Sequence, residues 1–178
     1  MAADYAVVKR VRDYEFLGTP LGNGATSWVF RCRHRDRPEV LLAVKELRDI
    51  DHNCAVQKNF ERERECLKGI QHPNVVRLHD HFVDKDDSSN TRSAYLILEF
   101  CPEGNLKNYF KKSREDRGFS EPEFMDFMGQ IADGLDVIWD HKIIHRDIKT
   151  ANVLVTIGKN DRSRYFWPER RPGEKREH

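Results

Sequence analysis

The order of strand-like and helix-like segments constrains the fold of this chain more than any other feature. Residues 14–50 consist of apolar runs separated by turns, and residues 94–100, AYLILEF, have the continuous apolar pattern of a buried strand. One helical pattern, residues 55–70, is inserted between these strands, and helical patterns follow residue 104. We therefore predict an α+β protein with two lobes joined near residues 99–104: about five strands with one helix, and then helices.

The longest predicted helix begins near Ser120. Ser120 and Glu123 have the spacing of a capping box, and Pro122 lies in the first turn, where its missing amide hydrogen costs little. The apolar residues of this helix recur at helical spacing: Phe124, Phe127, Met128, Ile131, Leu135 and Ile138. No later helical pattern is present in the sequence to cover them, so we expect an exposed apolar face.

Charge and composition argue against several classes of protein. The 178 residues carry a formal net charge of +1, which gives no bulk attraction to nucleic acid or to an anionic membrane surface. No apolar run approaches the roughly 20 residues of a membrane-spanning helix. Cys32, Cys54, Cys66 and Cys101 show no CxxC spacing, so we interpret them as free thiols in a reducing compartment. We expect a cytoplasmic protein with neither nucleic acid nor membrane as a partner.

A pair of glycines lies between two apolar runs. Gly22 and Gly24, in the stretch GNGATSWV, suit a hairpin whose backbone amides approach a phosphate closely, because glycine has no side chain in the way. Two glycines in a hairpin also form an ordinary turn, so this pattern alone leaves both interpretations open. A strand, residues 28–30, follows the glycines where a dinucleotide-binding motif requires a helix, and this argues against that motif.

Two charged residues stand at apolar positions. Lys45 ends the apolar strand LLAV, and Glu63 lies on the apolar stripe of the helix at residues 55–70. A charge in such a place either points to solvent or meets an opposite charge. One ion pair between Lys45 and Glu63 accounts for both residues and leaves the lysine in reach of phosphate oxygens. The alternative is a surface lysine at the end of a strand.

Three polar residues in the stretch HRDIKTANVLV combine an acid, a cation and an amide. Asp147 can accept a proton from a hydroxyl nucleophile, and Lys149 can offset charge on a transferred group. Asn152, at the start of an expected strand over residues 152–155, can offer a carbonyl oxygen to a hard cation such as Mg²⁺. Each residue alone would be ordinary in a polar turn, but the full H-R-D-x-K-x-x-N spacing is specific.

With these motifs in this order, the chain resembles the protein kinases over about residues 14–165. The resemblance implies ATP and Mg²⁺ as cofactors, with Lys45 on the α- and β-phosphates, fixed by Glu63. It also implies that Asp147 orients and deprotonates the substrate hydroxyl, that Lys149 steadies the γ-phosphate and that Asn152 holds Mg²⁺. The other nucleotide-binding residues that it implies are Leu21, Gly22, Gly24, Val29, Ala43, Leu98, Glu99, Cys101, Asn105 and Leu154.

Finer features of the sequence point to a subgroup. Lys149, two residues after Asp147, is typical of serine/threonine kinases. The stretches LGNGATSWVFRCRH, LILEFCPEGNL, SEPEF and HRDIKTANVLVTIG resemble the I-kappa-B-kinase-related group, of the TANK-binding kinase and IKK-epsilon type. This resemblance implies a signalling enzyme with a serine- or threonine-containing protein substrate, and a regulatory protein or a full-length kinase as a further partner.

The resemblance ends after Tyr165. Residues 166–171 read FWPERR where related kinases continue into the metal-binding Asp-Phe-Gly, so we interpret the chain as a kinase domain truncated before that motif. The charged tail lacks apolar periodicity, and we expect it to be disordered. The predicted divisions are an N-terminal extension (1–13), a kinase N-lobe (14–100), a partial C-lobe through the catalytic loop (101–165) and a divergent tail (166–178).

The sequence leaves two functions open. The first is an ATP-dependent serine/threonine protein kinase. The second is a catalytically impaired fragment that binds nucleotide or a partner protein, because Mg²⁺ lacks its main carboxylate ligand without the Asp-Phe-Gly aspartate.

Overall fold

The computed structural model of the 178-residue chain describes residues 5–24, 26–85, 91–113, 120–145 and 147–156. The chain divides into two compact units. The first comprises Met1–Arg64 and Leu78–Phe100, and the second comprises Glu65–Arg77 and Cys101–His178.

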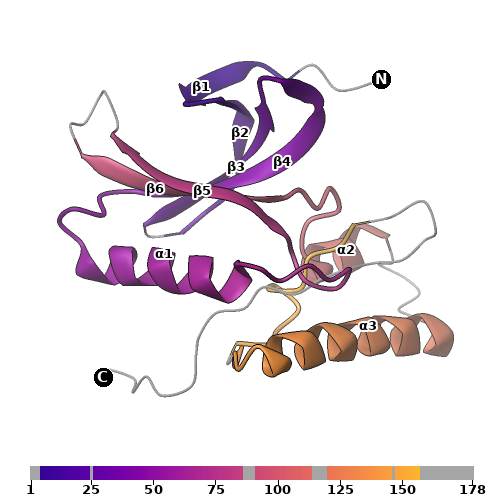
Figure 1. The fold of residues 1–178 in the computed structure, drawn as a ribbon. Helices are drawn as coiled ribbons and strands as arrows, with labels where there is room; N and C mark the ends of the chain where they lie inside the picture. Colours follow the sequence, from indigo (N-terminus) through magenta and orange to yellow (C-terminus); the bar gives the residue numbers. More distant parts are fainter. Residues whose placement is uncertain (1–4, 25, 86–90, 114–119, 146, 157–178) are drawn as a thin grey trace. The chain divides into compact units, whose positions relative to one another are not determined.

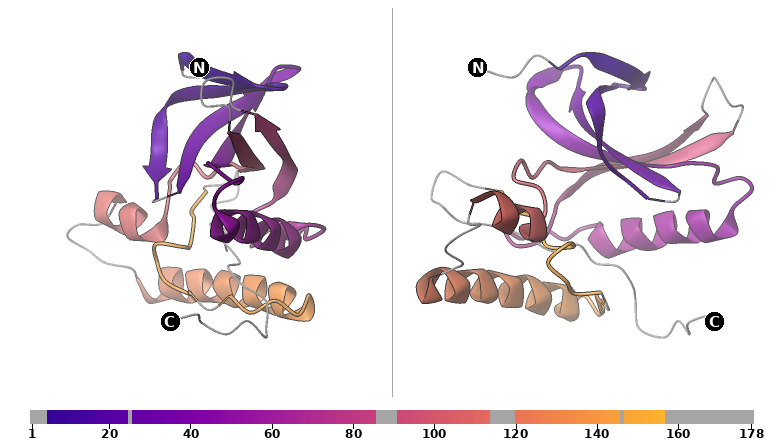
Figure 2. Two further views of the ribbon diagram at one scale, coloured as in Figure 1. Left: turned by 90° about the vertical axis from the view of Figure 1, so that its left-hand side faces the viewer. Right: turned by 180° about the vertical axis from the view of Figure 1, so that it is seen from behind.

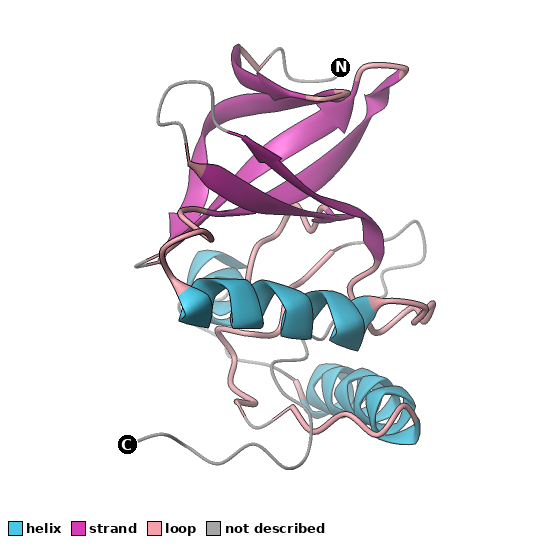
Figure 3. Cartoon of the chain, turned by 60° about the vertical axis from the view of Figure 1, so that its left-hand side comes forward, coloured by secondary structure: helices cyan, strands magenta, loops and turns pink. Residues whose placement is uncertain are grey.

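The first unit is built on an antiparallel sheet, to which the described residues contribute six strands in the order β1-β2-β3-β4-β6-β5 (Figure 1). The strands are β1 (Val7–Val11), β2 (Tyr14–Asn23), β3 (Ser27–His34), β4 (Arg37–Leu47), β5 (Leu78–Lys85) and β6 (Arg92–Glu99). The sheet curls strongly, and α1 (Cys54–Leu67) runs along its outer side (Figure 3). Among the described residues, α1 is the one helix inserted between the strands, as the sequence pattern predicts.

Alternation along the strands places one set of side chains inside the curl. Leu42 and Val44 of β4 are buried there with aromatic residues of the neighbouring strands. The rings of Phe82 and Tyr95 stack with their centroids 5.1 Å apart, and Phe16 meets Tyr95 edge-on at 6.0 Å. Each large apolar side chain that is fully buried contributes about 1.5–3 kcal/mol, so this inner core holds the curl closed.

Two element boundaries differ from the sequence prediction. Residues 7–11, which we assigned to an N-terminal extension, form β1 and pair antiparallel with β2. The segment VVKRV is only five residues long and carries two charges, so its alternation is too brief to distinguish a strand from a loop. α1 ends at Leu67 instead of residue 70, because Gly69 adopts a positive φ of 84° that no longer continues the helix.

The second unit contains α2 (Leu106–Ser113), α3 (Glu121–Asp140) and the segment that follows α3 (Figure 2). The capping box predicted at the start of α3 is present. Glu123 Oε2 accepts hydrogen bonds from the backbone N of Ser120 at 2.9 Å and from its Oγ at 2.6 Å. A sheet unit and a helical unit together confirm the predicted α+β class.

The strand expected at residues 152–155 is reduced to a single antiparallel bridge between Leu154 and Asn105. Among the described residues, its only partner is the short stretch that leads into α2. The two segments therefore form one bridge and not an extended ladder. Val153 and Val155 are nevertheless buried, and they pack with Leu106 of α2 in a small core. Burial of these alternate side chains fixes the segment together with two backbone hydrogen bonds of 2.7 Å, from Leu106 N to Val153 O and from Val155 N to Gly104 O.

α3 exposes apolar surface, as its sequence pattern predicts. Phe127 and Ile131 pack against the small core of the second unit. Phe124, Met125 and Met128 are exposed by 51%, 62% and 47%. Within the described ranges, no helix is both long enough and apolar enough to span a bilayer.

Candidate functional site

Lys45 and Glu63 form an ion pair inside the first unit. Lys45 Nζ of β4 lies 2.6 Å from Glu63 Oε2 of α1. The two side chains are 21% and 9% exposed, so the pair is largely shielded from solvent. A shielded charge needs an opposite partner to offset the loss of water around it. The ion pair predicted from two misplaced charges is therefore confirmed.

The strand register brings several predicted nucleotide-binding side chains to one face of the sheet. Val29 is opposite Lys45 across β3 and β4, and Ala43 is opposite Leu98 across β4 and β6. Cross-strand partners share a face, and so do Ala43 and Lys45, which are two residues apart. All four side chains therefore belong to the face that carries the ion pair, opposite to the inner core.

The glycine pair lies in the hairpin that β2 and β3 form: Gly22 is near the end of β2, and Gly24 directly follows the strand. Gly24 N donates a hydrogen bond of 2.7 Å to Ser27 O, and both Gly22 and Gly24 are exposed. A Cβ at Gly22 would meet no atom within 4 Å, and the φ of this residue is not positive. The fold itself thus does not require glycine at position 22, whereas close approach of a ligand to the backbone would. Leu21 beside it is 42% exposed.

Asp147, Lys149 and Asn152 meet in the second unit, in the segment after α3. Lys149 Nζ lies 2.5 Å from Asp147 Oδ2. Asn152 Nδ2 donates to Asp147 Oδ2 at 2.8 Å and to the backbone O of Asp147 at 2.9 Å. The side chains of Asp147 and Lys149 are 37% and 53% exposed, so a substrate can reach the cluster.

His145 positions Asp147, and the predicted site did not include it. This histidine is 3% exposed, and its Nδ1 accepts a hydrogen bond of 3.2 Å from the backbone N of Asp147. Nδ1 must be unprotonated to accept that bond. The H-R-D pattern was the available signal, because a histidine two residues before the acid lies within reach of its backbone.

The orientation of Asn152 bears on metal binding. Both hydrogen bonds to Asp147 use the amide nitrogen, so the carboxamide oxygen is the atom that can face a cation. Such an oxygen suits Mg²⁺, and Asn152 therefore fits the predicted role. Within the part of the chain that the structure describes, no group of three or more His, Cys, Asp or Glu side chains could hold a metal ion. Residues 166–171, compared above with Asp-Phe-Gly, lie outside that part.

The remaining predicted nucleotide-binding residues have local structural contacts. Asn105 caps α2, since its Oδ1 accepts a hydrogen bond of 2.8 Å from Asn108 N. The carbonyl oxygen of buried Cys101 accepts one of 3.1 Å from Gly104 N. Glu99 ends β6 and is partly exposed. These contacts explain the local structure, and a part in nucleotide binding stays a prediction for these residues and for Leu154.

Comparison with known proteins identifies the family. The model of the protein kinase domain matches residues 16–162 of this chain. The chain therefore belongs to the protein kinase family. The curled sheet with α1 and the partial helical unit correspond to the N-lobe and the partial C-lobe that the resemblance to protein kinases predicted.

Several curated kinases are similar to this chain. It is 36% identical over 153 residues to the serine/threonine-protein kinase ATG1c of Arabidopsis thaliana, which covers 85% of this chain and 19% of that relative. It is 32% identical to Aurora kinase B of Xenopus tropicalis, covering 78% of this chain and 36% of the relative. With the Aurora/IPL1-related protein kinase 2 of Caenorhabditis elegans it shares 31% identity, covering 94% and 52%. The chain thus spans from 19% to 52% of the length of these relatives.

Proposed function

We propose that this chain acts as an ATP-dependent serine/threonine protein kinase, which transfers the γ-phosphoryl group of ATP to a hydroxyl group of a protein substrate. The observation that carries the proposal is the cluster of Asp147, Lys149 and Asn152. Its acid, cation and amide are joined by hydrogen bonds of 2.5 to 2.9 Å. Protein kinases as a family use ATP with Mg²⁺ and act on protein substrates, and these residue types match the parts of that template.

Nucleotide binding falls to residues of the first unit in this proposal. Lys45, held by Glu63, offers its ammonium group to the phosphate oxygens. The backbone amides of Gly22 and Gly24 cover the phosphates at positions where no side chain interferes. Further apolar surface for the adenine comes from side chains on the face of Lys45: Val29, Ala43 and Leu98.

The chemical step falls to the cluster in the second unit. Asp147 orients the substrate hydroxyl and accepts its proton, and Lys149 offsets negative charge on the transferred group. Asn152 serves twice, because its nitrogen fixes Asp147 and its oxygen can hold Mg²⁺. Mg²⁺, when bound, neutralises the charge of the phosphates. The cluster thus supplies positioning and electrostatic stabilisation, on which phosphoryl transfer chiefly depends.

A second candidate is a catalytically impaired fragment that binds nucleotide or a partner protein. One sequence observation favours it. Residues 166–171 contain no aspartate, although kinases carry a metal-binding aspartate at the corresponding place. Such a chain would bind nucleotide through Lys45 and transfer phosphate slowly or not at all.

The test is transfer of labelled γ-phosphate from Mg-ATP to a mixture of serine- and threonine-containing peptides. We expect Asp147→Asn to lower the rate by about 10²–10⁴-fold, because the group that accepts the proton is lost. The same substitution at exposed Asp140, at the end of α3, serves as the control and should leave the rate unchanged. Transfer that survives Asp147→Asn would refute the catalytic role. Mg-ATP binding with no transfer in the unmodified chain would favour the second candidate.

The subgroup and the location are finer proposals. Placement in the I-kappa-B-kinase-related group rests on the quoted sequence stretches alone, and none of the three relatives described above supports it. A signalling role, and a regulatory protein or full-length kinase as a partner, follow only from that placement. A cytoplasmic location rests on the sequence spacing of Cys32, Cys54, Cys66 and Cys101, which we interpret as that of thiols in a reducing compartment.

A further inference from the structure

A fully buried carboxylate next to Lys45 takes no part in the proposed reaction. Glu46 of β4 has 0% of its surface exposed. Alternation along the strand turns its side chain to the inner face with Leu42 and Val44, while Lys45 faces the other side. A buried carboxylate is costly unless cations and hydrogen-bond donors surround it, and Glu46 therefore requires an explanation.

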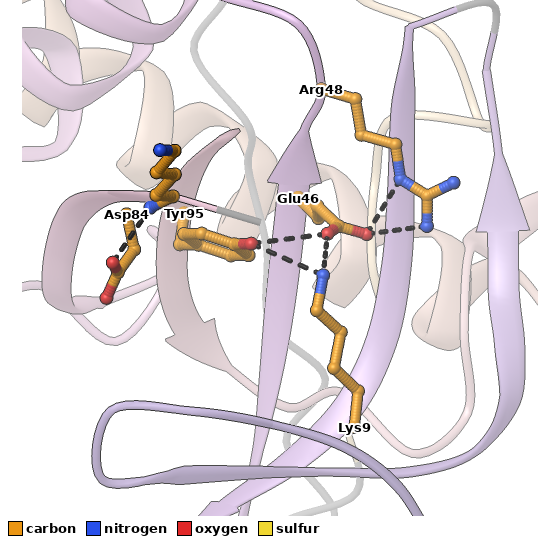
Figure 4. A network of polar contacts seen from close by, with 6 residues as sticks. Lys9, Glu46, Arg48, Asp84 and Tyr95 are labelled. Carbon is orange, nitrogen blue, oxygen red and sulfur yellow. Dashed lines mark hydrogen bonds and ion pairs between the residues drawn. The ribbon is translucent and has the colours of Figure 1, made fainter. Parts of the chain in front are cut away.

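Three side chains donate to this carboxylate (Figure 4). Lys9 Nζ lies 2.6 Å from Glu46 Oε1, and Tyr95 OH lies 3.3 Å from the same oxygen. Arg48 approaches Oε2 with Nε at 3.0 Å and Nη2 at 2.8 Å. Burial alone would disfavour the charged form of Lys9, but its hydrogen bond and its attraction to Glu46 outweigh this, so the pKa of Lys9 is raised. Two cations from different parts of the first unit thus converge on one inner-face carboxylate.

Lys9 belongs to the strand at the edge of the sheet. Among the described residues, β1 pairs with β2 alone, through four of its five residues, and its register shifts between Val7 and Lys9. A short, irregular edge strand gains little stability from its own ladder. Lys9 is opposite Phe16, so its side chain enters the inner core, where its ammonium lies 5.6 Å from the centre of the Tyr95 ring. The bond to Glu46 is therefore a main attachment of β1 to the interior.

Arg48 extends the same network to the glycine hairpin. Its backbone N donates to Thr26 O at 3.2 Å, and its guanidinium group lies 4.7 Å from the centre of the Trp28 ring. Thr26 directly precedes β3 and Trp28 lies in β3, on the side of the hairpin that follows Gly24. One carboxylate thus connects β1, β4, β6 and the hairpin.

We propose that Lys9 is a positioning residue for Lys45. By binding Glu46, Lys9 fixes β4 from the inner face of the sheet, while the ion pair with Glu63 fixes the same part of β4 from the outer face. Two ion pairs on consecutive residues of one strand link β1 to α1 across the sheet. When an uncharged residue replaces Lys9, Arg48 becomes the only cation beside Glu46. Because the side chain of Arg48 is 46% exposed, it pulls Glu46 toward the surface, and β4 shifts with it. The consequence for nucleotide affinity rests on the proposed function, but the link within the sheet does not.

Hydrogen–deuterium exchange without nucleotide tests the link. Wild type and Lys9→Met are compared at equal distances below their melting temperatures, which separates a local effect from a global loss of stability. In Lys9→Met we expect exchange to rise by about tenfold at residues 44–47 of β4 and 60–64 of α1, on the scale of one lost charged hydrogen bond. Exchange at residues 130–138 of α3, which belong to the second unit and have no part in the Glu46 network, should stay within about twofold. A uniform rise across these segments, or no rise, would overturn the proposal.

Three further variants isolate the charge on Glu46. Arg10→Met is the matched control, because Arg10 follows Lys9 on β1 but pairs with Glu15 and its side chain is 65% exposed. It should leave exchange unchanged. Lys9→Arg should restore most of the protection, because it keeps a positive charge at position 9. The double variant Lys9→Met with Glu46→Gln should also restore it, because it removes the buried negative charge that Lys9 offsets. If the double variant exchanges as fast as Lys9→Met at residues 44–47 and 60–64, the mechanism is contradicted. If Lys9→Met does not fold, Lys9→Gln takes its place with the same expected pattern.

Mg-ATP affinity gives a second readout. We expect Lys9→Met to weaken binding by about 5- to 10-fold and Arg10→Met to leave it unchanged. Unchanged affinity in Lys9→Met, with wild-type binding intact, would contradict the effect on Lys45. A wild-type chain that does not bind Mg-ATP would contradict the proposed function instead, and the exchange comparison would still decide the link between β1 and α1.

Discussion

Gly22 has room for a side chain, and this makes it a probe of ligand binding that is separate from folding. A Cβ at this position meets no atom within 4 Å. We expect Gly22→Ala to change the free energy of unfolding by less than about 1 kcal/mol. It should weaken Mg-ATP binding by about 3- to 10-fold, because the methyl group keeps the phosphates from the backbone amides. Titration with a fluorescent ATP analogue measures the affinity, and an unchanged affinity would argue against the hairpin as a phosphate site.

Tyr14 links the stability of the first unit to alkaline pH. Burial, together with the nearby Asp80 carboxylate, raises the pKa of Tyr14 well above its ordinary value, and burial also raises the pKa of Tyr95. Tyr14 OH donates a hydrogen bond of 3.0 Å to Asp80 Oδ2, so only the protonated phenol fits. A group with a raised pKa in the folded state stabilises the fold below its unfolded pKa of about 10 and loses this contribution as pH rises further.

We therefore expect urea denaturation to show falling stability above about pH 10, with a shallower fall in Tyr14→Phe than in the wild type. Tyr95 and Lys9 titrate in both proteins, so their effects cancel in the comparison. Parallel curves for the two proteins between pH 8 and pH 11 would show that Tyr14 does not titrate differently on unfolding.

At the residue scale, two charged residues of β4 form partly buried ion pairs, and the sequence predicted the pair of Lys45 but not that of Glu46. Lys45 ends a visibly apolar run, and its partner Glu63 lies on a helical stripe only 18 residues away, so both signals could be read together. Glu46 shares its face with Leu42 and Val44, which was the same kind of signal. Its partner Lys9 lies 37 residues away in a segment too short for its pattern to reveal a strand, so their pairing could not be predicted.

Among the elements, α3 offers two glycines in contrasting surroundings. A Cβ at Gly134 would lie 2.7 Å from the backbone O of Asn74, which is closer than such contacts allow. A Cβ at Gly129 would meet no atom within 4 Å. The first glycine is required by helix packing in the second unit, and the second is not.

The same substitution should therefore have opposite effects at these two positions. Gly129→Ala should stabilise the chain by about 0.5–1 kcal/mol, because alanine has the higher helix propensity. Gly134→Ala gains the same propensity but forces Asn74 away, and we expect a net loss of about 1–3 kcal/mol. Urea denaturation of both variants provides the measurement. Equal stabilisation would mean that α3 does not pack on Asn74 as described.

Elements with a local signature were predictable, and those that depend on distant partners were not. The start of α3 followed from Ser120 and Glu123, because a capping box is formed entirely by neighbouring residues. The segment at residues 152–155 has a strand-like sequence, but its pairing depends on the few residues before α2, and one bridge is all that they form. Asn105 was predicted as a nucleotide contact, and its function as the cap of α2 was missed.

At the scale of the whole molecule, the family and the fold class are shown by the comparisons and the structure, whereas the kinase activity of this chain is a proposal. The kinase domain model matches residues 16–162, and the sheet and helical units agree with it. The chain nevertheless spans no more than 52% of the three curated relatives described here, so its own activity must be measured on this chain. The central claim is that the first unit binds Mg-ATP through Lys45.

The most direct measurement is thermal unfolding of the chain with and without Mg-ATP, in wild type, Lys45→Ala and Lys58→Ala. Lys58 is an exposed lysine of α1 and serves as the control. At a nucleotide concentration about 100 times Kd, binding adds about 2.7 kcal/mol, which corresponds to roughly 5–10 °C in Tm. We predict this shift for the wild type and Lys58→Ala, and its loss in Lys45→Ala. A shift of the same size in Lys45→Ala, or no shift in the wild type, would contradict the account.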